Sequence, residues 1–237
     1  MSQTIFITDA HVGEAQGNAA DFSAMLERLE SDGRDIVFLG DIFDLWIALP
    51  RYERPIHREF CDWCRRQKTR RRIGFMEGNH EFFVARERAG AFSWCTDAPW
   101  RREGGGLLIV HGDLINRRDV NHLAFRRLAK SPLARCFLRC APRGPALAEA
   151  LKRRLRRTNR RFRTGLPEGE IRRFAEAWLS ADIHTVLAGH FHTARSCQGP
   201  RGGRLHLLPD WHASQAVSVL DHATGEVTRM NWRELGR

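Results

Sequence analysis

The sequence predicts a layered α/β fold, and two observations lead to that prediction. Short runs of β-branched and aromatic residues alternate with longer amphipathic stretches along the 237 residues. The composition, with 42% hydrophobic and 28% charged residues, is ordinary for a globular domain. Because this length can bury a full core and no repeat or low-complexity linker interrupts it, we expect residues 1–237 to form a single domain.

Eight strands and two helices can be placed from the pattern. The strands are expected at residues 4–8, 36–39, 73–77, 107–110, 185–188, 205–208, 216–220 and 227–232. A turn at 223–225 separates the last two. Residues 18–31 predict a helix that stops before Gly33 and carries four apolar residues on one face: Phe22, Met25, Leu26 and Leu29. Residues 171–179 have a similar pattern.

Polar residues follow each of the first five strands directly. They are Asp9 and His11, then Asp41 and Asp44, then Asn79 and His80, then His111 and Asp113, and finally His190 and His192. Glycines at 40, 78 and 189 lie beside them, where the backbone must bend sharply. Because open sheets bind ligands at the carboxyl ends of their strands, we expect these side chains to meet there.

The residue types in this set fit two divalent cations. Such a centre needs oxygen and imidazole ligands for cations roughly 3.5–4 Å apart, with one carboxylate that contacts both. One aspartate after a strand is more often a turn former, but five such motifs in this order indicate a site. Two cations sharing a water lower its pKa and neutralise phosphoryl oxygens, so the set predicts phosphoester hydrolysis.

These motifs resemble the five signature blocks of the calcineurin-like metallophosphoesterases. The blocks are Asp9-x-His11, Gly40-Asp41-x-x-Asp44, Gly78-Asn79-His80-Glu81, His111-Gly112-Asp113 and Gly189-His190-x-His192. The resemblance implies a four-layer α/β/β/α sandwich with a helical cap insertion. It implies one metal held by Asp9, His11, Asp41 and His192, and a second held by Asp41, Asn79, His111 and His190. Asp41 would bridge the two, and Glu81, where Asp is commoner, lies outside the ligand set.

The roles of single residues follow from that resemblance. We assign Asp41 and His80 to catalysis, with His80 stabilising or protonating the departing oxygen. The alternative is that His80 only packs against the site. Asp44 and Asp113 are expected to orient ligands through hydrogen bonds. The resemblance implies two manganese ions, although iron, zinc or cobalt suits the same ligands.

Within the superfamily the chain is similar to the bacterial UDP-2,3-diacylglucosamine diphosphatases of lipid A biosynthesis. The similarity lies in residues 40–46, 78–82 and 208–212 and in Asp119, Phe125 and Arg126. It implies cleavage of a UDP-linked lipid to UMP and 2,3-diacylglucosamine 1-phosphate. The implied substrate contacts are Asn79, His80, Asp119, Arg126 and His190. Two departures are His80, where the best-known members have Arg, and His122, where an aromatic residue is expected.

A basic insertion separates two of the metal blocks. The net charge is +11, and between Arg117 and Arg163 sixteen Lys and Arg accompany two acids. We expect residues 117–169 to form a helical cap with an apolar interior that takes acyl chains. Leu147, Leu151 and Leu155 recur every four residues there, and residues 136–138 add apolar surface. The basic rim of the cap would meet anionic headgroups at the inner membrane. Alternatively, the leucines only pack the cap onto the body and the charges are solvated.

Other classes of function remain open at this point. The enzyme could act on another phosphodiester, a nucleotide or nucleic acid, although Phe162 is poor support for base stacking in the basic tract. A non-catalytic binding protein on this scaffold would normally have lost metal ligands. The six cysteines fit reduced, small apolar residues. With no apolar run of about 20 residues, we expect a cytoplasmic protein, peripheral on the inner membrane. The sequence predicts no oligomeric state.

Overall fold

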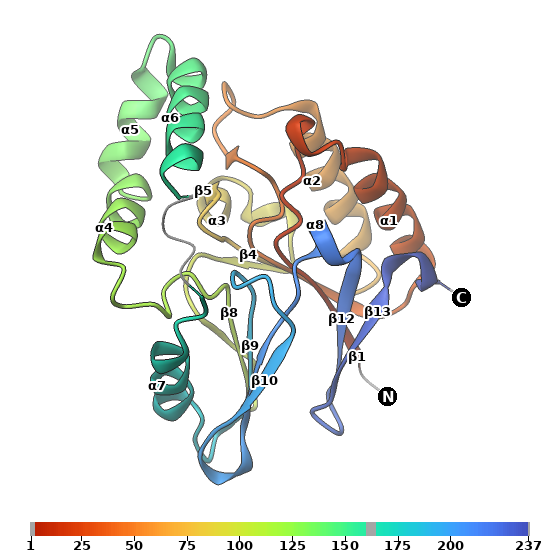
Figure 1. Ribbon diagram of the computed structural model, residues 1–237. Helices are drawn as coiled ribbons and strands as arrows, with labels where there is room; N and C mark the ends of the chain where they lie inside the picture. The colour runs from red at the N-terminus through yellow and green to blue at the C-terminus, as the bar shows by residue number, and fades with distance from the viewer. Residues whose placement is uncertain (1–2, 160–164, 237) are drawn as a thin grey trace.

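Two β-sheets lie face to face at the centre of the molecule, with helices on their outer faces (Figure 1). The computed structural model describes residues 3–159 and 165–236. The larger sheet has the order β13 (Val227–Asn231), β12 (Ala216–Asp221), β1 (Gln3–Ile7), β2 (Asp35–Leu39), β4 (Ile73–Met76) and β6 (Trp94–Thr96). The smaller sheet has the order β10 (Arg195–Gln198), β11 (Arg204–Leu207), β9 (Ile183–Ala188), β8 (Gly106–Val110) and β7 (Trp100–Arg101).

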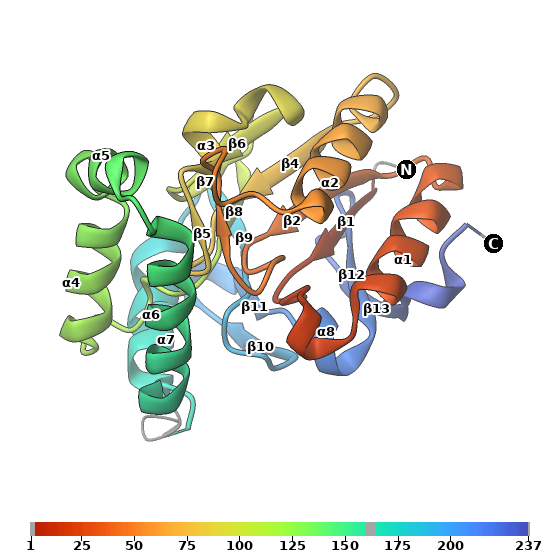
Figure 2. The same cartoon turned by 90° about the horizontal axis from the view of Figure 1, so that it is seen from above.

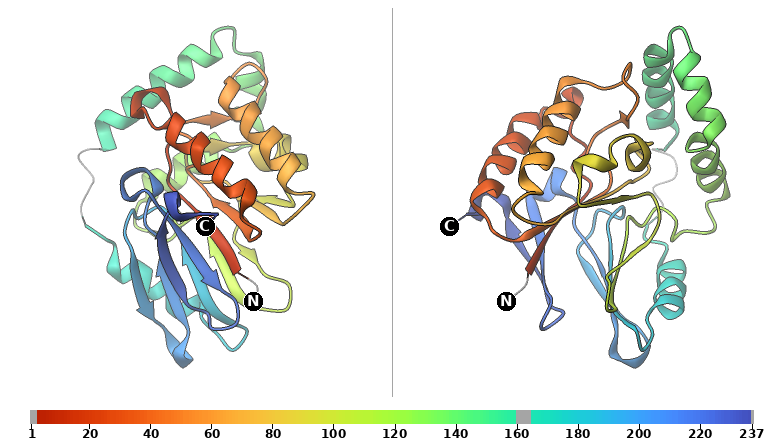
Figure 3. Two further views of the ribbon diagram at one scale, coloured as in Figure 1. Left: turned by 90° about the vertical axis from the view of Figure 1, so that its right-hand side faces the viewer. Right: turned by 180° about the vertical axis from the view of Figure 1, so that it is seen from behind.

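Helices cover both outer faces of the sheet pair. α1 (Ala19–Ser31) and α2 (Pro55–Gln67) lie on the larger sheet, and α7 (Glu168–Trp178) lies on the smaller one (Figure 3). The short elements are β3 (Trp46–Ile47), which pairs with β5 (Glu81–Phe82), and the helices α3 (Val84–Glu87) and α8 (Trp211–Ser214). The order helix, sheet, sheet, helix confirms the expected fold class.

The alternation of side chains along β1 produces these layers. Ile5 and Ile7 point to the helix side, where they join a core that includes Phe22 of α1 and Phe60 of α2. Phe6 points the other way, into an apolar layer between the two sheets. A third cluster lies between the smaller sheet and α7. Strand side chains alternate between faces, so a strand covered on both sides is apolar throughout.

Parallel pairing brings the carboxyl ends of the ligand-bearing strands to common edges. β1, β2 and β4 are parallel neighbours in one sheet, and β8 and β9 are parallel neighbours in the other. The expected strands agree with these elements to within a few residues at their ends. The expected helix at 171–179 begins earlier, at Glu168, and the pattern did not indicate α2. Cys61 and Cys64, which form a Cys-x-x-Cys motif, are buried and free within α2.

Three further helices form a separate layer, which we call the cap helices: α4 (Val120–Ala129), α5 (Pro132–Cys140) and α6 (Gly144–Asn159). They stand beside α3 and β5, outside the two sheets (Figures 1 and 2). Tyr52 ties the body to α5, because its hydroxyl donates to the carbonyl of Leu138 at 2.8 Å. Residues 160–164, and the side chains of Leu151 and Leu155, lie outside what the structure describes.

The apolar side of α5 faces outward rather than inward. Arg135 and Arg139 both bind Glu87 of α3, at 2.7 and 2.9 Å. Because these arginines are one turn apart, their pairing turns the opposite face of α5 to solvent. Leu133 is 80% exposed and Phe137 is 60% exposed. The expected apolar interior is therefore limited to residues such as Leu138, which packs against a small cluster on the body.

Candidate metal centre

Five of the seven predicted ligands have a left-handed backbone conformation. The φ angles are 51° at Asp9, 46° at His11, 53° at Asp41, 70° at His190 and 52° at His192. Residues other than glycine rarely adopt the left-handed backbone conformation, and residues strained in this way are common at functional sites. Each follows the end of β1, β2 or β9. In the Asp-x-His and His-x-His motifs, the turn after the strand thus directs two side chains that are two positions apart toward one place.

Asp9 uses only one of its carboxylate oxygens for the fold. Its Oδ2 accepts hydrogen bonds from the hydroxyl of Thr8 at 2.6 Å and from the backbone amide of His190 at 2.8 Å. Among the residues described, Oδ1 is buried without a hydrogen-bond partner. Nε2 of His192 lies 3.2 Å from Oδ1, and Nε2 of His11 lies 4.0 Å from it. A buried anionic oxygen facing two imidazoles is a donor set for a cation.

Asp41 lies in the middle of the cluster. Its Oδ1 accepts a hydrogen bond from the backbone amide of His80 at 2.9 Å, and its Oδ2 lies 3.5 Å from Nε2 of His111. The potential ligand atoms form three overlapping groups, each within 4.8 Å: Asp9, His11 and His192; His11, Asp41 and His80; and Asp41, His111 and His190. The carboxylate of Asp41 therefore stands between two possible cation positions, where a bridging ligand belongs.

Asn79 completes the set from a third loop. Its Oδ1 lies 3.3 Å from Nε2 of His111. The other ring nitrogen of His111, Nδ1, is 2.9 Å from the carbonyl oxygen of Leu39. A carbonyl can only accept, so Nδ1 carries the hydrogen and Nε2 is the atom directed at the cluster. The structure thus brings all seven predicted ligands together.

The pKa values describe how this site carries charge. Burial lowers the pKa of His11 and of His190 to about 4, so both imidazoles are neutral near pH 7 and keep a free lone pair. Burial also disfavours a charged His111, but the Asp41 carboxylate outweighs it and raises the pKa of His111 to about 10. Burial raises the pKa of Asp41, yet the surrounding histidines hold it well below its usual range. Protonated His111 interacts with the Asp41 carboxylate, so a cation that binds Asp41 would compete with that proton.

Glycine is required in three of the ligand loops because other groups come too close. A Cβ on Gly78 would lie 2.1 Å from Oδ1 of Asp41, and one on Gly40 would lie 2.4 Å from Nδ1 of His111. A Cβ on Gly189 would meet the Thr8 hydroxyl at 2.2 Å. Any side chain at these positions would displace a ligand or its support.

Glu81 binds the backbone of two ligand loops, a role that the sequence did not reveal. It is fully buried, and its two oxygens accept hydrogen bonds from four backbone amides: Asp41 at 2.8 Å, Ile42 at 2.7 Å, Phe43 at 3.3 Å and Gly78 at 2.8 Å. Burial and the nearby Asp41 raise the pKa of Glu81 to about 7. The only sequence signal was its place two residues after Asn79, with a longer side chain than is common there.

The remaining predicted residues lie around this cluster. Nδ1 of His80 is 2.7 Å from the carbonyl oxygen of Asp44, and its Nε2 is 3.9 Å from Oδ2 of Asp41. Asp119 is exposed, and its carboxylate caps α4 by accepting from the amide of His122 at 3.0 Å. Arg126 pairs with Asp113 at 2.5 Å. Sequence reasoning missed Lys152 of α6, whose Nζ is 2.6 Å from Oδ2 of Asp44.

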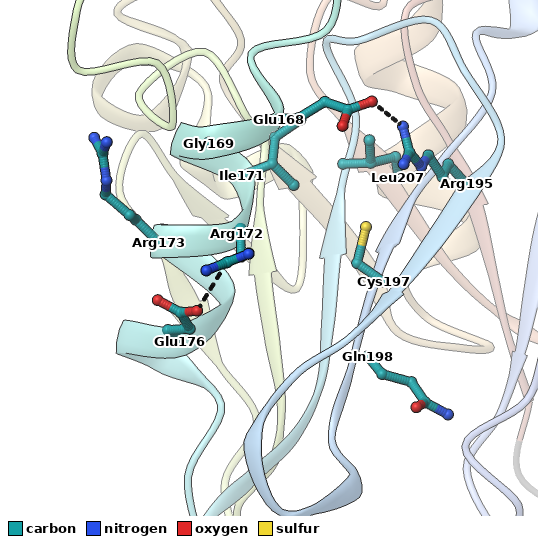
Figure 4. Close-up of a pocket in the computed structure, with 10 residues that line it drawn as sticks. All are labelled: Glu168, Gly169, Ile171, Arg172, Arg173, Glu176, Arg195, Cys197, Gln198 and Leu207. Carbon is teal, nitrogen blue, oxygen red and sulfur yellow. Dashed lines mark hydrogen bonds and ion pairs between the residues drawn. The ribbon is translucent and has the colours of Figure 1, made fainter.

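A separate cavity of about 450 Å³ lies between α7 and β10, away from the predicted ligands (Figure 4). Four of its charged residues form two ion pairs: Glu168 with Arg195 at 2.6 Å, and Arg172 with Glu176 at 3.1 Å. None of the predicted ligands lines it. The chemistry of the described residues therefore points to the Asp9–His192 cluster rather than to this cavity.

The ligand atoms present fit two divalent cations, because carboxylate, amide and imidazole donors converge from five loops. The chain belongs to a family with that chemistry: residues 3–194 match the family model of the calcineurin-like phosphoesterases. It is therefore a metal-dependent phosphoester hydrolase, as the motifs predicted.

The chain is also similar to individual members of this family. The chain is similar to the UDP-2,3-diacylglucosamine hydrolase of Azotobacter vinelandii, with 25% identity over 92% of this chain and 94% of the relative. It is also similar to the enzyme of that name from Ralstonia nicotianae, with 28% identity over 94% and 90% of the two chains. Among solved structures, an archaeal phosphodiesterase aligns with 96% of this chain and 98% of its own, at 10% identity and a TM-score of 0.47.

Proposed function

We propose that this enzyme hydrolyses the diphosphate of UDP-2,3-diacylglucosamine to UMP and 2,3-diacylglucosamine 1-phosphate. The observation that carries the proposal is similarity to curated hydrolases of this substrate over at least nine-tenths of both chains. The dinuclear ligand cluster supports it, because diphosphate cleavage needs a water nucleophile and neutralisation of phosphoryl charge. When bound, two cations supply both.

In this proposal His80 acts on the departing oxygen. Its Nδ1 donates to the carbonyl of Asp44, which leaves Nε2 directed toward Asp41 and the cluster. Asn79, His80 and His190 would contact the diphosphate from the cluster itself. Asp119 and Arg126 would contact the substrate from α4. As water attacks phosphorus and the bond to the bridging oxygen breaks, the doubly protonated form of His80 would give that oxygen its Nε2 proton and keep the Nδ1 hydrogen on the Asp44 carbonyl.

The cap helices support a lipid-linked substrate through their outward surface. Leu133, Cys136, Phe137 and Cys140 form one exposed stripe on α5, at the i, i+3, i+4, i+7 spacing of a helix face. Arg127 of α4 and Arg143, just before α6, are exposed as well. An exposed apolar stripe on a basic cap suits an anionic bilayer. The proposal therefore places the enzyme on the cytoplasmic face of the inner membrane.

The reaction is tested with UDP-2,3-diacylglucosamine and purified protein loaded with manganese, with release of UMP followed by phosphorus NMR. We expect turnover in the unmodified protein and none with Asp41→Asn, which keeps the size of the side chain but removes its charge. A protein that holds two cations yet leaves this substrate intact would remove the proposal. Cleavage of single-stranded DNA or cyclic nucleotides instead would favour a nucleotide-directed enzyme. Binding without hydrolysis would indicate a binding protein.

The membrane contact is tested separately by co-sedimentation with vesicles of phosphatidylglycerol and phosphatidylcholine. We expect the double variant Leu133→Ser, Phe137→Ser to sediment less than the unmodified protein, because it loses the apolar part of the contact. Val227→Ser, a half-buried change on β13, is the control for loss of apolar surface elsewhere. Equal sedimentation of all three proteins would refute contact through α5.

A further inference from the structure

Polar side chains attach α4 and the residue that ends it, Lys130, to the body of the enzyme. None of the residues of α4 is buried. His122, Arg126 and Lys130 recur every four residues and so lie on one face. The first two approach Asp113, at 3.7 and 2.5 Å. Lys130 reaches a different loop, the one that carries Asn79 and His80.

Lys130 makes two hydrogen bonds in a nearly closed environment. Its side chain is 7% exposed. Nζ donates to Oε2 of Glu77 at 2.8 Å and to the carbonyl oxygen of Gly78 at 2.8 Å. It also lies 5.9 Å from the ring centroid of Phe82. An ammonium buried to this degree stays charged only when it is paired, so these contacts hold it in one place.

Glu77 is equally constrained. It is buried, and its Oε1 accepts from the backbone amide of Ala85 at 2.7 Å while Oε2 binds Lys130. The carboxylate therefore links α3 to the end of α4. The buried ion pair of Glu77 and Lys130 thus connects the body to the cap helices.

The hydrogen bond from Lys130 to the Gly78 carbonyl connects α4 to the loop of the metal centre. This carbonyl belongs to the peptide group that joins Gly78 to Asn79. On its other side, Gly78 is so close to Asp41 that a Cβ would lie 2.1 Å from Oδ1. The Gly78 amide, which belongs to the preceding Glu77–Gly78 peptide group, donates to Glu81 at 2.8 Å. Glu81 therefore holds the peptide group before Gly78, and Lys130 holds the one after it.

We propose that Lys130 is a positioning residue that sets the Gly78–Asn79 peptide and so aims Asn79 and His80 at the dinuclear centre. It acts through the loop and touches neither the cation positions nor the reacting atoms. The placement of α4 and the geometry of the centre are therefore linked. The inference rests on the ligand cluster and is independent of which phosphoester is cleaved.

The first test is a calorimetric titration of metal-free protein with Mn²⁺ at a temperature where all variants are folded. We expect Lys130→Met to weaken binding at one of the two positions by about 10–100-fold, the usual effect of losing a group that orients a metal ligand. Lys68→Met is the matched control, since Lys68 donates to the carbonyl of Gly90. Unchanged affinity in folded Lys130→Met would overturn the proposal.

A double variant separates positioning from simple loss of stability. Lys130→Met leaves the Glu77 carboxylate buried and unpaired, whereas Lys130→Met with Glu77→Gln leaves no buried charge. We expect the double variant to recover thermal stability but not Mn²⁺ affinity, because the Gly78 carbonyl still lacks its donor. The kcat for bis(4-nitrophenyl) phosphate should stay low in parallel, with KM nearly unchanged. Recovery of affinity together with stability would show that Lys130 only compensates charge.

Discussion

The backbone amide of His190 donates a hydrogen bond to Oδ2 of Asp9 at 2.8 Å. The two residues are 181 positions apart in the chain. This bond joins the end of β9 to the end of β1, so it connects the two sheets at the metal centre. It also leaves Oδ1 of Asp9 free to face His11 and His192.

Asp9→Asn should reduce the metal content of the protein. The amide oxygen can still accept from His190, but the amide nitrogen then faces the two imidazoles without a negative charge. We expect at least one cation per chain to be lost and hydrolysis to fall more than about 100-fold. Elemental analysis after dialysis against Mn²⁺ measures this. Asp62→Asn, on the exposed face of α2, should keep the full content; full content in Asp9→Asn would contradict the assignment.

Gly78→Ala should disable the centre without unfolding the protein. The added Cβ would lie 2.1 Å from Oδ1 of Asp41, so the carboxylate or the loop must shift. We expect a loss of activity of about 100-fold or more, because displacements of this size disrupt catalytic geometry. Gly90→Ala is the control, since its Cβ would meet nothing within 4 Å. Equal activity of the two variants would show that the loop absorbs the change.

Glu81→Gln should destabilise the fold by about 2–4 kcal/mol, because backbone amides would lose their acceptor in a buried place. One carboxylate oxygen becomes an NH₂ group that faces donors at either Asp41 and Gly78 or Ile42 and Phe43. Urea unfolding of metal-free protein measures the difference. Glu59→Gln, an exposed change on α2, should leave the free energy of unfolding within about 0.5 kcal/mol.

The Glu53–Arg88 pair should make the free energy of unfolding depend on pH. Burial raises the pKa of Glu53, but hydrogen bonds from Arg88 at 2.9 Å and from the Trp46 indole at 3.2 Å outweigh it, so the pKa is lowered. A lowered pKa in the folded state stabilises the protein above the pKa of the unfolded chain, and the stabilisation disappears as pH falls through the folded value.

Glu53→Gln should therefore cost about 1–3 kcal/mol at pH 7, where the carboxylate is ionised, and less near pH 3. Denaturant unfolding of both proteins at the two pH values measures this. A difference that grows toward pH 3 would mean that the carboxylate is not stabilised by Arg88. Asp62→Asn again serves as the control for an exposed pair.

The positions of the expected strands, and the meeting of the seven predicted ligand side chains in one place, could be predicted from the sequence. Each of the first five apolar runs ends in a polar motif, and parallel strands place such motifs at one edge of a sheet. The motifs alone therefore indicated that these side chains would meet. The match to the calcineurin-like phosphoesterases confirms the family, the layered α/β fold and the class of enzyme. The division of ligands between two cations and the choice of substrate stay predictions.

The sequence did not reveal how charged residues would be buried. The sequence around Lys130 and Lys152 does not indicate that either side chain would be shielded from water, and Glu81 was expected to lie outside the ligand set. The basic insertion was expected to turn its apolar side inward, but pairing of Arg135 and Arg139 with Glu87 turns part of that side outward.

Local sequence therefore determined where strands end and which side chains emerge there, because periodicity and backbone geometry act over a few residues. Only the tertiary structure decided which charges are shielded from water, since each buried charge depends on a partner brought from a distant part of the chain. That is why the converging polar side chains could be predicted from motifs, while the groups that hold their loops in place became visible only in three dimensions.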